Sequence, residues 1–256
     1  MAGSEPGRHI PLPGTLNFRD VGGYPTAAGG TIRWRRLLRS DALHRLDSDA
    51  AAMLGELGLR TVIDLRTHSE TELAPSPLDS FAERGTRVTG LSLIGENLTA
   101  LPSALDDIYQ FIVDQRGPAI AAAVRVLAGP AALPALVHCA AGKDRTGIVV
   151  ALVLAAVGVP DQFIAADYAL SRIYLDPATT SAIGRVRDAS GMGDRLTEDL
   201  MASPPELIAA VLDRVREQAG TVQGYLTRHG ATAAELSALR AALVEGTGGQ
   251  QRRESG

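Results

Sequence analysis

Hydrophobic positions in the first half of the chain fall into short blocks that alternate with longer amphipathic stretches. Residues 59–65, 88–93 and 134–138 form short apolar runs that contain β-branched side chains. Such runs are typical of strands buried on both faces of a parallel sheet. Residues 31–40 mix β-branched, aromatic and basic side chains and predict one or two further short strands.

Helical patterns fill the intervals between these strands. Asp47 or Ser48 can cap a first helix, and residues 105–115 repeat apolar side chains at helical spacing. Residues 118–128 predict a further helix, whose initial proline suits the first helical turn. Residues 146–157 predict a helix that is apolar almost throughout, as expected for a helix buried in the core.

The order of these elements predicts the organisation of the whole chain. Beyond residue 160, prolines and glycines separate several predicted helices. Alternating strands and helices predict one α/β domain over residues 14–245, with a short, mostly parallel sheet flanked by helices and a helical C-terminal half. The ends, residues 1–13 and 246–256, are rich in glycine and polar residues and are expected to be flexible.

Composition narrows the classes of function. Of 256 residues, 45% are hydrophobic and 21% are charged, as in an ordinary globular protein. The formal net charge of −4 argues against a nucleic-acid binder or a protein held on an anionic membrane, since either needs a basic face. The longest apolar run, 148–159, is too short for stable membrane insertion, and the N-terminus lacks a secretory signal. A cytoplasmic location is expected, with export by a non-classical route left open.

The single cysteine and the single lysine of the chain lie close together, at Cys139 and Lys143. One cysteine excludes an intramolecular disulfide and any multi-cysteine metal site. The five histidines are scattered along the sequence, so neither a metal nor another cofactor is expected. Around the cysteine, the sequence LVHCAAGKDRTGIVV runs from an apolar strand through a glycine-containing loop into an apolar helix.

This strand, loop and helix suit a bound phosphate dianion. A helix N-terminus presents unpaired N–H groups and partial positive charge, and short loop residues let the backbone curve around an anion. Arg145 offers a planar fork for two phosphate oxygens, and the same donors would stabilise the thiolate of Cys139 as a nucleophile. A buried structural cysteine beside a surface arginine is the alternative, but it explains neither the spacing nor the loop. The predicted substrate-binding residues are Ala140, Ala141, Gly142, Lys143 and Thr146.

The segment HCAAGKDRTG resembles the phosphate loop of cysteine-dependent protein tyrosine phosphatases, H-C-x5-R-[ST]-G. Its G-K-D-R-T-G part is similar to that of the atypical bacterial tyrosine/lipid phosphatases, the protein-tyrosine-phosphatase-B-like group. The resemblance extends over most of residues 14–245 and implies a tyrosine-phosphatase-like fold. Further segments resemble that group: NFRDVGG from Asn17, LRSD from Leu38, VIDLR from Val62, ADY from Ala166 and GYL from Gly224.

The resemblance implies a metal-independent hydrolase that works in two steps. Cys139 would attack a phosphate monoester and form a cysteinyl-phosphate, while Arg145 binds the phosphoryl oxygens. An acid would protonate the leaving oxygen and then activate water. The resemblance points to Asp144 as this acid, because the chain has no W-P-D motif. Asp64, at a predicted strand end, is the second candidate, and its structural alternative is an ion pair that orients Arg145 or Arg66.

Several neighbouring residues keep two interpretations. Lys143 is either a solvated loop lysine or a second cation for a phosphoinositide, as in lipid phosphatases. Thr146 is expected to donate a hydrogen bond to the sulfur of Cys139, with a helix cap as the alternative. His138 is expected to fix the loop through hydrogen bonds rather than to act as a base.

The N-terminal motif and the middle of the chain are less informative. Asn17, Arg19 and Asp20 either line the rim of the pocket or form turn and ion-pair contacts before two glycines. Residues 66–117 contain no pattern that can be matched to the family, which leaves a lid over the site as an open question.

The expected partner is a phosphorylated protein or a phosphoinositide, with phosphotyrosine, phosphoserine, phosphothreonine and lipid phosphates left unranked. A rhodanese-like sulfurtransferase also uses a loop cysteine, but that function gives no reason for the Arg145-Thr146-Gly147 ending. An arsenate reductase usually needs further cysteines. Intact Cys139 and Arg145 argue against an inactive phosphate-binding module.

Overall fold

The computed structural model describes residues 7–77, 81–83, 85–95, 101–102, 104–175 and 203–246. Its centre is a five-stranded sheet in the order β1-β3-β6-β4-β5. Strands β3, β6, β4 and β5 run parallel to one another, and β1 pairs antiparallel with β3. The strands are β1 (Arg19–Asp20), β3 (Leu37–Ser40), β4 (Thr61–Asp64), β5 (Arg87–Gly90) and β6 (Ala135–His138). The expected α/β class with a short, mostly parallel sheet is confirmed.

The register of the central strands brings their carboxyl ends to one level. Ser40 of β3 and Asp64 of β4 both pair with His138 of β6. The segments that follow these strands therefore leave the sheet side by side, at the edge where open α/β sheets usually bind ligands. The loop after β6, in the middle, contains Cys139.

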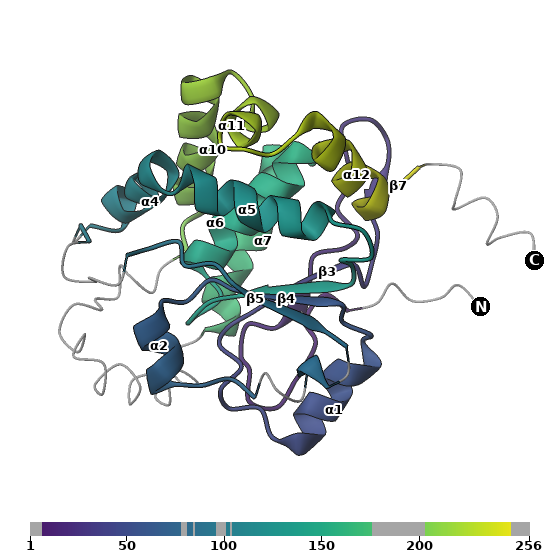
Figure 1. Cartoon of the computed structure of the whole chain (residues 1–256). Helices are drawn as coiled ribbons and strands as arrows, with labels where there is room; N and C mark the ends of the chain where they lie inside the picture. The colour runs from purple at the N-terminus through teal and green to yellow at the C-terminus, as the bar shows by residue number, and fades with distance from the viewer. Residues whose placement is uncertain are drawn as a thin grey trace, which may run out of the picture.

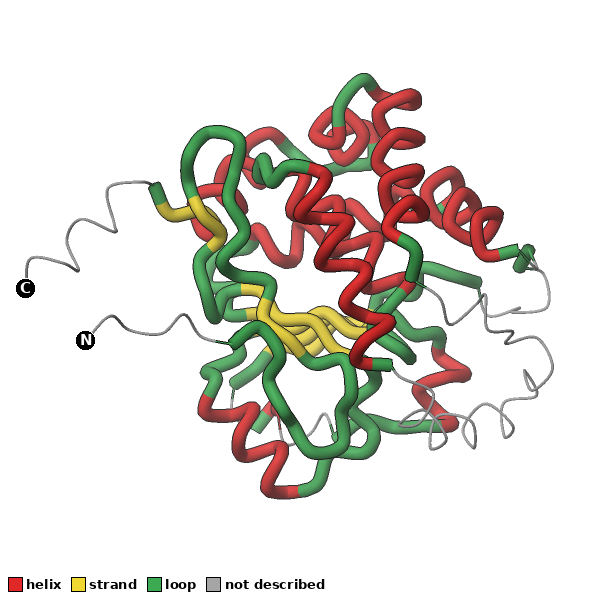
Figure 2. Tube along the Cα trace, turned by 180° about the vertical axis from the view of Figure 1, so that it is seen from behind, coloured by secondary structure: helices red, strands yellow, loops and turns green. Residues whose placement is uncertain are grey.

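Helices cover both faces of the sheet, but unequally (Figure 1). On one face lie α1 (Ser48–Glu56) and α2 (His68–Leu73). The other face carries the helical C-terminal half together with two earlier helices. These are α4 (Leu105–Gln115), α5 (Gly117–Ala128), α6 (Asp144–Ala156), α7 (Asp161–Tyr174), α10 (Pro205–Ala219), α11 (Val222–Arg228) and α12 (Ala233–Leu243). Seen from behind, the strands lie between these two unequal layers (Figure 2).

Alternation along the strands creates the two cores that hold these layers. Leu37, Ile63 and Val137 belong to the large core under α4–α12, whereas their neighbours Leu38 and Val62 face α1. Burial of the α6 residues from Ile148 to Leu154 explains why that helix is apolar nearly all round. Because α6 begins where the loop after β6 ends, its packing fixes the position of that loop.

Most predicted elements are present, with shifted ends. Helix α4 spans the predicted residues, α6 begins at Asp144 instead of 146, and β5 ends at Gly90 instead of 93. Asp47 caps α1 by accepting a hydrogen bond from the amide of Ala50 at 2.8 Å. Residues 31–40 contain two of the short strands, as predicted: β3, and β2 (Thr31–Ile32), which pairs with β7 (Val244–Glu245) in a two-stranded ribbon. Helix α2 and β7 had no predicted counterpart.

Residues near both termini were expected to be flexible. Leu12 is only 4% exposed, and Arg8 donates hydrogen bonds to the carbonyls of Asp20 and Gly22. The packed part of the chain therefore starts before residue 14. Residues 1–6 and 247–256 lie outside the described residues, as do 78–80, 84, 96–100 and 103 within the segment considered as a lid. None of the described helices has the length and apolar character needed to cross a bilayer.

Candidate active site

The loop from Cys139 to Arg145 packs directly against the backbone that follows β3. Gly142 has a φ of +65°, and a Cβ built on it would lie 2.2 Å from the carbonyl oxygen of Ser40. Only glycine combines this left-handed conformation with so close an approach. The curved shape of the loop is therefore fixed by contact with its neighbour.

The carbonyl groups of the loop are held on its outer side. The amide of Ala42 donates to the carbonyl of Ala140 at 3.0 Å. The side-chain amide of Asn17 donates to the carbonyls of Ala141 and Gly142, each at 3.0 Å. In a trans peptide the N–H points opposite to the C=O, so the amides of residues 141–143 point to the inner side of the loop. This arrangement creates a concave anion site with N–H donors, at the N-terminus of α6.

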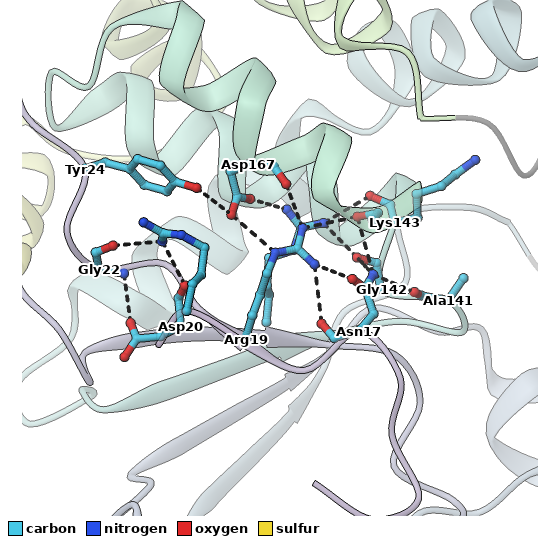
Figure 3. Close-up of polar contacts among 12 residues, drawn as sticks. Asn17, Arg19, Asp20, Gly22, Tyr24, Ala141, Gly142, Lys143 and Asp167 are labelled. Carbon is cyan, nitrogen blue, oxygen red and sulfur yellow. Dashed lines mark hydrogen bonds and ion pairs between the residues drawn. The ribbon is translucent and has the colours of Figure 1, made fainter. Parts of the chain in front are cut away.

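A buried ionic cluster lies behind the loop (Figure 3). Arg39 donates from Nη2 to the carbonyl of Gly142 at 2.7 Å and from Nη1 to Asp167 Oδ2 at 2.6 Å. Arg19 contacts the other carboxylate oxygen of Asp167 through Nε at 3.3 Å and also donates to Asn17 Oδ1. The cluster thus links the N-terminal segment, β3 and α7 to the loop.

Arg145, the last residue of the loop, is held by Glu70 of α2. Its Nη1 and Nη2 donate to the two carboxylate oxygens of Glu70 at 2.6 and 2.7 Å. Burial alone would raise the pKa of Glu70, but the hydrogen bonds from Arg145 outweigh burial and lower that pKa. Thr67 caps α2 and donates its amide to Glu70 Oε2 at 2.8 Å. The guanidinium is therefore held in one orientation at the loop.

Asp144 begins α6 and is the most exposed carboxylate of the loop region. Its Oδ1 accepts a hydrogen bond from the hydroxyl of Tyr109 at 2.6 Å and lies 3.2 Å from Lys143 Nζ. Tyr109 Oη lies 2.7 Å from Tyr168 Oη, so Tyr168 donates to Tyr109 when Tyr109 donates to Asp144. Burial and the charge of Asp144 raise the pKa of Tyr109 well above its usual range. Tyr109 is therefore a protonated donor to Oδ1 of Asp144.

Asp64, the second candidate acid, is engaged in a different contact. Both of its carboxylate oxygens accept hydrogen bonds from Arg66, the shortest at 2.7 Å. Burial alone would raise the pKa of Asp64, but the bonds from Arg66 and the neighbouring His138 lower it. The ion-pair alternative predicted for Asp64 is thus present, with Arg66 as the partner rather than Arg145.

The geometry therefore combines a cysteine, a concave row of N–H donors, a fixed guanidinium and a carboxylate within the segment from Cys139 to Arg145. A family model described as the tyrosine phosphatase family matches residues 10–245. The chain belongs to the tyrosine phosphatase family. The resemblance to its B-like group is confirmed by the relatives described next.

Two curated relatives align with nearly the whole phosphatase. It is 32% identical over 274 aligned residues to the triple specificity protein phosphatase PtpB of Mycobacterium tuberculosis, covering 91% of this chain and 98% of that protein. It is 29% identical over 228 residues to a tyrosine-protein phosphatase of Nostoc commune, covering 86% and 78%. A crystal structure of the core catalytic domain of the PP-IP phosphatase SIW14 from S. cerevisiae, in complex with citrate, gives a TM-score of 0.40 at 18% identity. That match covers 72% of this chain and 96% of that chain.

The structure excludes the expected bond of Thr146 and one alternative each for Thr146 and Lys143. The hydroxyl of Thr146 is buried without a hydrogen-bond partner, so the bond to Cys139 is not formed. Since α6 begins at Asp144, Thr146 lies inside the first turn and does not cap the helix. Lys143 is only 2% exposed, so it is not a solvated loop lysine.

His138 lies on the sheet side of the loop. Burial lowers the pKa of His138 to about 4, so its ring is neutral at pH 7. Its Nε2 lies 3.6 Å from Asp64 Oδ2. The backbone of Cys139 also acts on the ring of this fully buried side chain, so the expected contact of His138 with the loop stays a prediction.

Sequence reasoning missed several residues that support the site. Glu70 has a sequence signal, because Thr67 and Glu70 form a capping box after a predicted strand. Arg39 and Asp167 lie in segments that resemble the family, but their charges gave no indication that they pair. Asn17, Arg19 and Asp20, expected either at the pocket rim or in turn and ion-pair contacts, are fully buried. Among the described residues, no group of three His, Cys, Asp or Glu side chains has the proximity that a metal site requires.

Proposed function

We propose that this phosphatase hydrolyses phosphate monoesters through a cysteinyl-phosphate formed at Cys139. The observation that carries the proposal is the loop itself, whose carbonyls are held outward while its amides face the concave side. The thiolate sulfur attacks phosphorus, and the bond between phosphorus and the leaving oxygen breaks. Water then attacks the cysteinyl-phosphate and releases inorganic phosphate and the thiolate.

In this proposal Arg145 binds the phosphoryl oxygens in both steps. Glu70 occupies the Nη1–Nη2 edge of its guanidinium, which leaves the Nε–Nη2 edge for a phosphate. Asp144 donates a proton from Oδ2 to the leaving oxygen and then accepts one from the attacking water. Asp64 transfers no proton and only holds Arg66 in place, because Arg66 donates hydrogen bonds to both of its carboxylate oxygens.

A cysteine variant tests the mechanism. Cys139→Ser should abolish turnover of para-nitrophenyl phosphate while binding of vanadate persists, because the cradle remains. The wild type should retain activity in EDTA and lose it to iodoacetamide. Turnover by the serine variant, or loss of wild-type activity on chelation, would contradict the mechanism. Wild-type activity on thiosulfate instead of a phosphate ester would favour a sulfurtransferase.

The acid is tested by leaving groups of different acidity. Asp144→Asn should slow hydrolysis of phenyl phosphate about 100-fold and of para-nitrophenyl phosphate much less, since a good leaving group needs little protonation. Asp64→Asn is the matched variant and should slow both substrates alike. If Asp64→Asn shows the leaving-group dependence and Asp144→Asn does not, the two roles are reversed.

The proposed substrate range includes phosphotyrosine, phosphoserine, phosphothreonine and phosphoinositides. Support comes from the name of the relative PtpB, which describes more than one specificity, and from the buried ammonium of Lys143 beside Asp144. Lys143→Ala should lower kcat/KM about tenfold more for a phosphoinositide than for a phosphotyrosine peptide, because the lipid carries further phosphates. Lys143→Arg should retain part of the difference. Equal losses on both substrates would make Lys143 a general loop residue.

A further inference from the structure

Most cationic side chains around the phosphate loop form an ion pair with a carboxylate of their own. Among the described residues, Arg145 pairs with Glu70, Lys143 with Asp144, Arg66 with Asp64 and Arg45 with Asp41. The exception is the cluster behind the loop, where Arg19 and Arg39 share the single carboxylate of Asp167. Two cations and one anion leave this cluster with an unbalanced positive charge.

That charge is buried. The side chains of Arg19, Arg39 and Asp167 are each at most 1% exposed. Burial and the neighbouring charge of Arg39 lower the pKa of Arg19 only to about 10, so it stays protonated at pH 7. Burial alone would raise the pKa of Asp167, but the two arginines lower it to about 2. An unbalanced charge in a protein interior is costly unless something nearby compensates for it.

The compensation lies in the loop. Arg39 Nη2 donates to the carbonyl of Gly142 at 2.7 Å and approaches the carbonyl of Lys143 at 3.4 Å. Each of these peptide groups has its negative end on the cluster and its N–H on the opposite side. Figure 3 shows Asn17 beside Ala141 and Gly142, while the side chain of Lys143 extends away from the cluster. The unbalanced charge and an anion in the cradle would therefore lie at opposite ends of the same peptide dipoles.

We propose that the Arg19–Asp167–Arg39 cluster is an electrostatic support that strengthens oxyanion binding by the phosphate loop. Arg39 positions the loop carbonyls, and Arg19 makes the charge of the cluster positive without touching the loop. The proposal rests on the proposed function of the loop as a phosphate site. An electrostatic support can be distinguished from a purely mechanical one. If the support is electrostatic, phosphate affinity rises when a substitution makes the cluster more positive and falls when a substitution makes it less positive.

Substitutions that change this charge in both directions give the test. The dissociation constant of inorganic phosphate is measured by calorimetry on the full chain. Arg19→Gln removes the unbalanced charge and should weaken binding about tenfold, whereas Arg19→Lys keeps the charge and should stay near wild type. Asp167→Asn adds one more positive charge and should strengthen binding by a similar factor.

Neutral controls separate charge from structure. Ser171→Ala and Tyr24→Phe each remove a hydrogen bond within the cluster without changing its charge, and should leave phosphate affinity within about twofold. Thermal unfolding of every variant identifies those that remain folded. Arg19→Lys binding as weakly as Arg19→Gln, or a folded Asp167→Asn binding more weakly than wild type, would overturn the proposal. If Asp167→Asn does not fold, the Arg19 pair decides.

The same experiment separates this inference from the function on which it rests. If wild type binds no phosphate, the loop is not a phosphate site and both proposals are wrong. If wild type binds phosphate and all cluster variants weaken it regardless of charge, the loop function stands and the electrostatic support is wrong.

Discussion

Two arginine–carboxylate pairs lie at the same edge of the sheet and differ in what they leave unused. Asp64 and Arg66 form a closed pair. Arg66 also donates to the carbonyl of Ala74 and to Ser76 Oγ, so Nε, Nη1 and Nη2 are all engaged. Arg145 donates only from Nη1 and Nη2, to Glu70 and the carbonyl of Leu65, among the described residues.

The two pairs differ in the hydrogen-bonding capacity that each arginine retains. Both arginines donate two or more hydrogen bonds to a carboxylate, and their side chains are 2% exposed in Arg66 and 11% exposed in Arg145. Only Arg145 retains an N–H edge for a ligand. A buried salt bridge by itself therefore does not identify a functional arginine. What identifies it is the hydrogen-bonding capacity that the fold leaves unsatisfied.

Exchange of each arginine for lysine is the most severe test of this comparison. Arg145→Lys keeps the charge but loses the planar fork, so kcat/KM should fall about 1,000-fold or more. Arg66→Lys should change kcat/KM less than about fivefold and instead lower the free energy of unfolding by about 1–3 kcal/mol, because buried acceptors lose donors. Steady-state kinetics and urea unfolding of both variants provide the measurement. Comparable activity losses in the two variants would show that the pairs do not differ in role.

Removal of the charge on Glu70 should have an intermediate effect. Glu70→Gln keeps the shape of the side chain but replaces one accepting oxygen with a donor that opposes Arg145. We expect kcat/KM to fall on the order of tenfold to 100-fold, mainly through kcat, because the guanidinium is less well oriented in the transition state. Glu72→Gln, on the exposed side of the same helix, is the control and should be neutral. An unchanged kcat in Glu70→Gln would mean that the loop alone orients Arg145.

The smallest expected effect is on the pH dependence of stability. The pKa of His138 is lowered from 6.5 to about 4, so its neutral form is favoured in the folded state. The unfolded chain binds the extra proton first on acidification, so stability should fall as the pH decreases from about 6.5 to 4. Asp64 and Glu70, whose pKa values are also lowered, should add a further loss below about pH 4.

Urea unfolding between pH 4 and 7 measures this dependence. His138→Gln should remove the decrease over this range, whereas the further loss below about pH 4 should remain. If the wild type and the variant have parallel pH profiles, His138 titrates normally and its burial has no consequence for acid stability.

The sequence carried most of the information about the loop because that information is local. The strand, the spacing from Cys139 to Arg145 and the apolar helix are contiguous, and each follows from residue type and periodicity. The support of the loop is not local. Arg39 reaches Asp167 across 128 residues, and Glu70 reaches Arg145 across 75. The periodicity of hydrophobic residues in a sequence does not predict such a pairing, because the pairing depends on how strands and helices are arranged after folding.

The error at Thr146 has the same origin. The expected bond from its hydroxyl to Cys139 is absent, and the start of α6 at Asp144 places the residue inside the first helical turn. Lys143 shows the opposite case. A lysine in a loop is usually exposed, but this one is enclosed because tertiary packing overrides that tendency.

The attachment of the loop to Asn17 has a consequence for the folding of the chain. Asn17 holds the carbonyl of Ala141 from 124 residues away, and Arg19 reaches Asp167 across 148. The contacts that hold the cradle are therefore complete only after α7 has met the first strand. Contacts of such long sequence separation form slowly. We expect the cradle to be completed late in the folding of the chain.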